Sequence, residues 1–265
     1  MKRVIPLTAL LCASSLHAAT TYTGSPNSIF DAASWDNGLP GLANQGTINA
    51  DAAWPSDNDM NGWDLLLAGG TLTDASTSFS TNEIYGASKL AIQGGTWARG
   101  GVVRLHGGAE VTVSGGSASI GGIAAISAAT GGGEDGGFTL NVSSGSFTSN
   151  NVINFNNQLN TSTINITGGT ATMGYGSSDT RPIDESNTLF NVSGGTLDLY
   201  SLRMTATDNN IVVTVSSGTL VVGAGGYDPN SVDGLTDMRY VNFPAGSTGS
   251  WTLAGADQAA FEALY

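Results

Sequence analysis

Seven short phrases between residues 65 and 220 repeat one pattern of apolar and polar positions. Each phrase begins with two apolar residues on either side of an outward one. Four positions follow in order: a small residue, then Gly or Ser, then Gly, then Thr or Ser. Alternation with period two predicts a short strand with one buried face. The glycines permit a bend with positive φ, so each phrase predicts a strand, a corner and a second extended segment. The phrases are LLLAGGTL, LAIQGGTW, VTVSGGSA, LNVSSGSF, INITGGTA, FNVSGGTL and VTVSSGTL.

The spacing of the phrases predicts a solenoid. Their second glycines are 25, 21, 29, 24, 26 and 23 residues apart, at Gly70, Gly95, Gly116, Gly145, Gly169, Gly195 and Gly218. Such a period suits a coil of three short strands, and stacked coils align their apolar pairs into interior ladders. We therefore expect an all-β, single-domain, right-handed parallel β-helix (β-solenoid) of about seven coils of roughly 25 residues.

Other periodic folds fit less well. Leucine-rich repeats need an LxxLxLxxN pattern that no segment shows, and a propeller blade needs roughly forty residues. Calcium-binding nonapeptide repeats need GGxGxD in series, whereas this chain has one Gly-rich acidic stretch, GGGEDGG at 131–137. We expect that stretch to be a loop inserted into the longest interval.

The first nineteen residues predict export. Lys2 and Arg3 precede an apolar stretch over 4–16 that is too short to span a membrane, and small residues follow at Ala18 and Ala19. We expect residues 1–19 to be a cleaved signal peptide. It contains Cys12, the single cysteine, so the mature chain has no thiol for a disulfide or a metal site.

The segments that flank the repeats differ from them. Residues 20–64 hold Phe30, Trp35, Trp54 and Trp63 among turn residues, and we expect an N-terminal cap and the first coil there. The β-helix repeats are expected over 65–255. Residues 256–265, ADQAAFEALY, have apolar residues at helical spacing and are expected to form a C-terminal capping helix or a truncated segment.

The charge balance narrows the range of partners. The chain has 21 acidic and 8 basic residues, a net charge of −13, and removal of Lys2 and Arg3 gives 6 − 21 = −15. So acidic a chain repels phosphate backbones and anionic lipid surfaces, which argues against nucleic-acid and membrane-surface partners. No apolar stretch predicts a membrane span in this chain.

The chain resembles secreted bacterial parallel β-helix proteins related to autotransporter passenger repeats, including surface proteins of the PEP-CTERM type. The resemblance rests on the leader, the segment FDAASWDNGLP, the repeated phrase, and the closing GSTGSWTLAGADQAAFEALY. It implies an exported, elongated protein, secreted or at the cell surface of a Gram-negative bacterium, with polysaccharide or other cell-surface components as partners.

Parallel β-helices also carry polysaccharide lyases and hydrolases, so acid–base candidates need attention. His106 is the single histidine outside the leader, and Arg99, Arg104 and Glu110 lie near it in one predicted coil. An arginine beside carboxylates is able to act as a base. A solvated charge cluster is the simpler interpretation, and we assign no catalytic residue.

Two acidic pairs are the other catalytic candidates, because glycoside hydrolysis needs two carboxylates across a cleft. Glu134 and Asp135 are adjacent, as are Asp184 and Glu185, and both pairs lie in segments rich in Gly or Ser. Adjacent residues of a strand point to opposite faces, so solvated loop charge is the favoured interpretation.

One segment resembles a calcium loop. Asp57, Asp59 and Asn61 alternate before Gly62, as in the first half of an EF-hand loop, but Ala68 stands where that loop needs a bidentate Glu. A calcium site at Asp57, Asp59, Asn61 and Asp64 is one expectation, and an Asp/Asn-rich turn is the other. No other cofactor is expected.

Two further sets of residues recur on the predicted coils. Asn141, Asn165 and Asn191 begin Asn-x-Ser/Thr triplets at one position of the repeat, where stacked outward side chains explain them without glycosylation. Trp97 and Tyr200 are considered as exposed platforms for sugar rings.

Two functions from different classes follow. The first is an exported, non-catalytic structural or adhesive rod of the cell surface or extracellular matrix. The alternative is a polysaccharide-binding or polysaccharide-degrading β-helix, and a groove of facing carboxylates, or Arg104 beside such a group, is the feature that would favour it.

Overall fold

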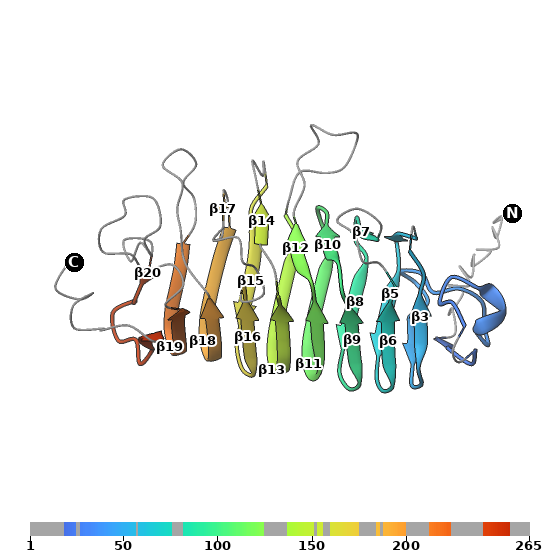
Figure 1. Ribbon diagram of the computed structural model, residues 1–265, viewed down its shortest axis with the longest axis horizontal. Helices are drawn as coiled ribbons and strands as arrows, with labels where there is room; N and C mark the ends of the chain where they lie inside the picture. The colour runs from blue at the N-terminus through green and yellow to red at the C-terminus, as the bar shows by residue number, and fades with distance from the viewer. Residues whose placement is uncertain are drawn as a thin grey trace, which may run out of the picture.

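Short parallel strands stack rung upon rung along one axis in the computed structural model (Figure 1). The structure describes residues 19–24, 27–56, 58–75, 82–124, 137–150, 153–155, 160–174, 184–185, 188–199, 212–223 and 241–254. All but the last residue of the predicted signal peptide, and the whole of segment 256–265, lie outside these ranges. Within them the single helix is the short 3-10 turn η1 (Ala32–Ser34).

Each rung has two arms that meet at a corner. The first arm contains β2 (Gly46–Ile48), β5 (Asp64–Leu67), β8 (Lys89–Ile92), β15 (Ser162–Ile166) and β20 (Val241–Asn242), and β1 (Thr20–Thr21) pairs with β2. The second arm contains β3 (Ala52–Trp54), β6 (Thr71–Asp74), β9 (Thr96–Arg99), β16 (Thr170–Met173) and β21 (Ser250–Ala254). Four strands run through both arms, namely β11 (Glu110–Ile120), β13 (Thr139–Ser149), β18 (Thr188–Leu199) and β19 (Val212–Gly223). Together they form one 15-stranded sheet.

A second sheet closes the coil on its third side. It contains six strands, β4 (Met60–Asn61), β7 (Glu83–Tyr85), β10 (Val102–Leu105), β12 (Gly122–Ala124), β14 (Ile153–Phe155) and β17 (Asp184–Glu185). All strand pairs in both sheets are parallel, and the fold is a β-solenoid of about six turns, where about seven coils were expected. The predicted fold class is confirmed.

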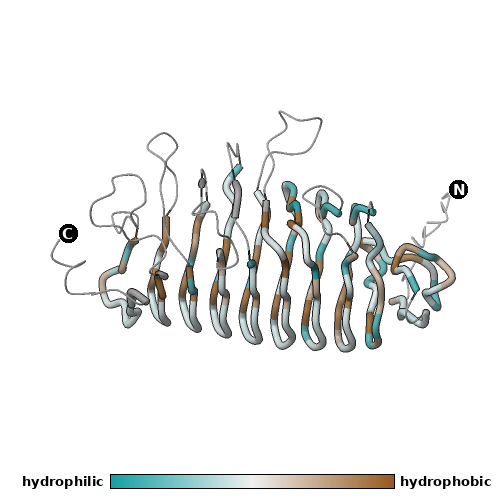
Figure 2. Tube along the Cα trace, viewed as in Figure 1, coloured by the Kyte–Doolittle hydropathy of each residue, from teal (hydrophilic) through white to brown (hydrophobic). Residues whose placement is uncertain are grey.

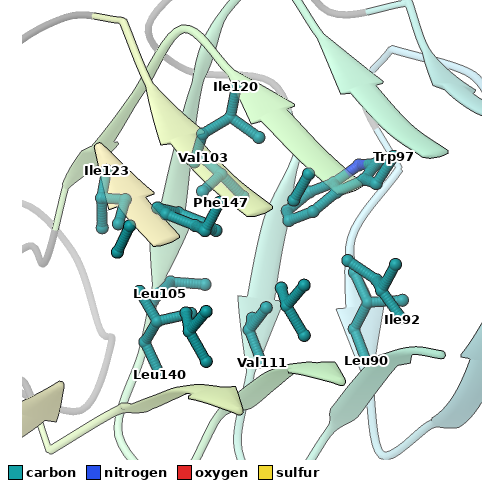
Figure 3. Close-up of a cluster of buried hydrophobic side chains, with 14 of the residues drawn as sticks. Leu90, Ile92, Trp97, Val103, Leu105, Val111, Ile120, Ile123, Leu140 and Phe147 are labelled. Carbon is teal, nitrogen blue, oxygen red and sulfur yellow. The ribbon is translucent and has the colours of Figure 1, made fainter. Parts of the chain in front are cut away.

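The apolar pairs of the phrases form the interior ladder. Leu140 pairs with Ile164 in the next rung, Ile164 with Phe190, and Phe190 with Val213, and all four side chains are fully buried. Hydrophobic residues recur at the same heights along the tube (Figure 2), and the close-up shows them meeting between the sheets (Figure 3). Removal of these apolar surfaces from water is what binds one rung to the next.

Glycine is needed at the corner for two reasons. Six of the seven second glycines have φ between 67° and 82°, a left-handed conformation that a Cβ disfavours, and Gly116 is the exception. The rungs also approach closely here, since a Cβ on Gly169 would lie 2.6 Å from the carbonyl oxygen of Gly145. The second glycine of the corner is therefore disfavoured for any larger residue, both by its conformation and by the neighbouring rung.

Candidate functional site

Charged side chains converge on the third side of the solenoid, around Glu83. Glu83 begins β7, Arg104 lies opposite it in β10, and His106 follows directly after β10. Arg104 Nη1 donates to Glu83 Oε1 at 2.7 Å, and His106 Nε2 lies 2.6 Å from Glu83 Oε2. Two of the predicted acid–base candidates thus contact one carboxylate, because adjacent rungs place their outward residues side by side.

Two further residues complete this group. The Tyr85 hydroxyl donates to Glu83, and its ring stacks on His106 with 4.0 Å between centroids and 14° between planes. Asp59, in the preceding rung, accepts the backbone N–H of Glu83 through Oδ1 at 3.0 Å. We name Asp59, Glu83, Tyr85, Arg104 and His106 the Glu83 cluster.

The surroundings of the cluster separate the pKa values of its two carboxylates. Burial alone raises the pKa of Glu83, but hydrogen bonds from His106, Tyr85 and Arg104 outweigh it and lower that pKa from 4.5 to about 2. Burial raises the pKa of Asp59, although its bond with the Glu83 backbone opposes the change. Burial and the bond to Glu83 raise the pKa of the Tyr85 hydroxyl.

These properties limit the chemistry of the cluster. Glu83 stays ionised at neutral pH and both its oxygens are bonded, so it has no proton to give as a general acid. His106 Nδ1 and Arg104 Nε are buried and have no hydrogen-bond partner among the described residues. The arrangement is a hydrogen-bond network around the Arg104–Glu83 ion pair, and the Asp59 bond to the Glu83 backbone extends it to a third rung.

Arg99 and Glu110, which were grouped with Arg104 and His106 in the sequence, lie elsewhere. Arg99 ends β9 pointing inward, and its Nη1 lies 2.6 Å from Oδ2 of Asp74, with both side chains fully buried. Glu110 begins β11 on the first arm, where its Oε2 lies 4.0 Å from Lys89 Nζ. The intervening corner and strands send the four residues to different sides of the coil. Their interpretation as a solvated charge cluster is wrong for Arg99 and His106, because both residues are buried.

The asparagines of the Asn-x-Ser/Thr triplets form a ladder on the first arm. Asn165 Nδ2 donates to Asn141 Oδ1 at 2.9 Å, and Asn191 Nδ2 donates to Asn165 Oδ1 at 2.9 Å. Asn141 Nδ2 in turn donates to Glu110 Oε1 at 3.1 Å. Stacking of outward amides is confirmed as the explanation for the recurring asparagines.

The predicted calcium ligands are only partly described. Asp57 lies outside the described residues, Asp59 belongs to the Glu83 cluster, and Asn61 is exposed in β4. Asp64 accepts from Gln45 Nε2 at 2.9 Å on the first arm. No three of the described His, Cys, Asp and Glu side chains form a group able to hold a metal ion. Calcium binding stays a prediction.

The acidic pairs and the aromatic platforms have different outcomes. Glu134, Asp135 and Tyr200 lie outside the described residues, and Asp184 and Glu185 form β17, where only the backbone is described. Trp97 is fully buried and stacks on Trp54, 6.3 Å between centroids. Its prediction as an exposed platform is wrong, because the second residue after each glycine corner points inward.

Sequence reasoning missed Glu83, Tyr85 and Asp74. A signal for the inward ion pair existed, since Asp74 and Arg99 both stand four residues after a corner glycine, where later rungs place Ile120, Ser149, Met173, Leu199 and Val222. No such signal marks Glu83 and Tyr85, because the segments between the second arm and the third side differ in length from rung to rung.

Comparisons with known proteins add no relative: no family model matches the chain, and neither the curated proteins nor the solved structures contain a match. In the part of the chain that the structure describes, no helix has the length and apolar character needed to cross a membrane.

Proposed function

We propose that this protein is an exported, non-catalytic structural or adhesive rod of the cell surface or extracellular matrix. The observation that carries the proposal is that outward polar side chains bond to one another between neighbouring rungs. The amides of Asn141, Asn165 and Asn191 bond one another, and the Glu83 carboxylate bonds residues of its own and the following rung. Polar groups that satisfy their neighbours stiffen a rod and leave few free for a substrate.

Export is supported by the leader-like residues 1–19 and by the absence of cysteine after Cys12. The test is expression of the full chain in a Gram-negative host, with mass spectrometry of the protein outside the cytoplasm. We expect a mature chain that begins at Thr20. Retention of the intact chain in the cytoplasm would contradict export.

A polysaccharide-binding or polysaccharide-degrading β-helix is the second candidate, and the Glu83 cluster favours it. Arg104 stands beside a carboxylate, and the pKa values of Asp59 and Glu83 are displaced in opposite directions, as in acid–base pairs of enzymes. It ranks second because the Asp59 carboxylate accepts the backbone N–H of Glu83, and the Glu83 carboxylate is bonded to Arg104 and His106. Two carboxylates held in this way do not form a cleft around a glycosidic bond.

Incubation of the purified chain with acidic and neutral polysaccharides separates the two functions. The rod predicts neither new reducing ends nor unsaturated products. Any product that forms with the natural chain and is lost in Glu83→Gln would assign an enzymatic role to the cluster, and Thr163→Ala on the first arm is the matched control.

A further inference from the structure

The outward face of the second arm carries a continuous column of hydroxyl side chains. The residue after each corner is Thr or Ser in eight successive rungs, and neighbouring members pair in register. Each is at least partly exposed. The column contains Thr71, Thr96, Ser117, Ser146, Thr170, Thr196, Thr219 and Ser250.

A second column runs beside the first, two residues further along each strand. Its members are Thr73, Ala98, Ser119, Thr148, Thr172, Asp198, Val221 and Thr252. Both columns hold hydroxyls in five of the eight rungs, at β6, β11, β13, β16 and β21. We name the sixteen positions the hydroxyl face.

The hydroxyl face differs in charge from the rest of the molecule. In a chain with 21 acidic residues and a net charge of −13, one of its sixteen positions is charged, Asp198. On the first arm, by contrast, Asp64, Lys89 and Glu110 follow one another in three paired rungs. A face with a single charge among sixteen positions complements a neutral partner better than an ionic one.

The backbone beneath holds the face rigid and regular. Between the two columns lie the inward side chains Leu72, Trp97, Ala118, Phe147, Ala171, Leu197 and Leu220, each at most 1% exposed. Adjacent parallel strands are about 4.8 Å apart and alternate residues of one strand about 6.6 Å apart, so the positions of the hydroxyl face repeat in two dimensions. These repeats are close to the spacings of oxygen atoms on a surface of hexagonal ice.

We propose that the hydroxyl face binds ice, an activity that goes beyond the proposed structural role. Hydroxyls on rigid strands hydrogen-bond ordered water. Two pairs of neighbours also bond each other, Thr96 Oγ1 with Ser117 Oγ at 3.0 Å and Thr219 Oγ1 with Ser250 Oγ at 3.3 Å. A neutral polysaccharide fits less well, because the sixteen positions include no aromatic ring on which a sugar could stack.

A second copy of the chain also fits less well. Eight rungs about 4.8 Å apart and two columns wide give a footprint of roughly 400 Å². Stable protein pairs bury about 800 Å² per partner.

The experiment measures inhibition of ice recrystallisation and partition of the purified full chain into a slowly growing ice front. We expect the natural chain to inhibit recrystallisation and to enter the ice. Thr148→Lys, in the middle of the face, should raise the concentration needed roughly tenfold. Thr163→Lys is the matched control, since it adds the same charge at a half-exposed outward position of the first arm, and it should leave inhibition unchanged.

Several outcomes would overturn the proposal. They are no inhibition by the natural chain, an equal loss in the two lysine variants, retention on crystalline cellulose instead of ice, or a dimer in sedimentation that Thr148→Lys dissolves. Circular dichroism and urea unfolding check that the variants fold. If Thr148→Lys is misfolded, Thr148→Val, which removes only the hydroxyl from a similar shape, takes its place with the same expected direction.

Discussion

Replacement of a corner glycine by alanine is expected to destabilise the solenoid by two separable effects. Gly62 lies in the turn between β4 and β5 and not at a corner, and it isolates the first effect because its φ is +73° and a Cβ meets nothing within 4 Å. The left-handed conformation costs alanine about 1–2 kcal/mol, and the smaller entropy of the unfolded chain offsets about 0.4–1 kcal/mol of that cost. Gly62→Ala should therefore lower the free energy of unfolding by about 1 kcal/mol.

The second effect is the close approach of the neighbouring rung. Gly194 shows this effect alone, and Gly169 combines it with positive φ. Gly194 has no positive φ, but a Cβ there would lie 2.3 Å from the Thr167 carbonyl oxygen. Such overpacking costs about 1–3 kcal/mol. Gly169 has φ of +67° and a contact of 2.6 Å to the Gly145 carbonyl oxygen, so Gly169→Ala should cost about 3 kcal/mol.

Urea unfolding followed by circular dichroism measures these differences. With a slope near 2 kcal/mol per molar urea, the midpoint of Gly169→Ala should fall by roughly 1.5 M and that of Gly62→Ala by roughly 0.5 M. The slopes must agree for the comparison to hold, since a solenoid need not unfold in one step. If Gly169→Ala and Gly62→Ala share a midpoint, the close approach of the rungs contributes nothing and the reasoning fails.

The remaining predictions concern the polar networks. Arg99→Met removes the cation 2.6 Å from the buried Asp74 and should lower the free energy of unfolding by about 3–5 kcal/mol; a change under about 1 kcal/mol in urea unfolding would contradict a native ion pair. The pKa of Glu83 is lowered from 4.5 to about 2 in the folded chain, so the stability that the ionised carboxylate contributes is complete above pH 4.5 and is lost as the pH falls toward 2. Glu83→Gln should weaken this acid dependence of the free energy of unfolding. An unaltered pH profile in the variant would refute the prediction. Asn165→Ala removes two side-chain hydrogen bonds of the asparagine ladder and should lower the free energy of unfolding by about 1–3 kcal/mol. Thr163→Ala, at an outward position on the same strand, is the control.

The repeat made the fold predictable. Apolar pairs at fixed distances before a glycine form one continuous ladder only when the rungs stack in parallel. This stacking sets the strand register in which Ile164 pairs with Phe190. Trp97 shows that the same pattern was sufficient to place an aromatic side chain inward, two residues after the corner, although it was considered as an exposed platform for sugar rings. Local alternation is reliable wherever the distance to a corner is fixed.

The Glu83 cluster was not predictable for the opposite reason. Arg104 meets Glu83 because β7 and β10 are adjacent on the third side, and the lengths of the segments that lead to each strand set that register. Those segments carry no apolar pattern, so neither Glu83 nor Tyr85 could be assigned to a neighbour of His106. Contacts between rungs are long-range in sequence, and only the common axis brings them together.

The arrangement of the two sheets has a mechanical consequence. Backbone hydrogen bonds between rungs lie along the axis, and each interface between two rungs is held by short ladders on the two arms and the third side, acting in parallel. The interfaces follow one another in series. A pull on the two ends therefore loads every interface with the same force, and the tensile strength is set by the weakest one, irrespective of the number of rungs. Among the described strands, β18 and β19 pair along both arms, from Leu189 and Val212 to Leu199 and Val222.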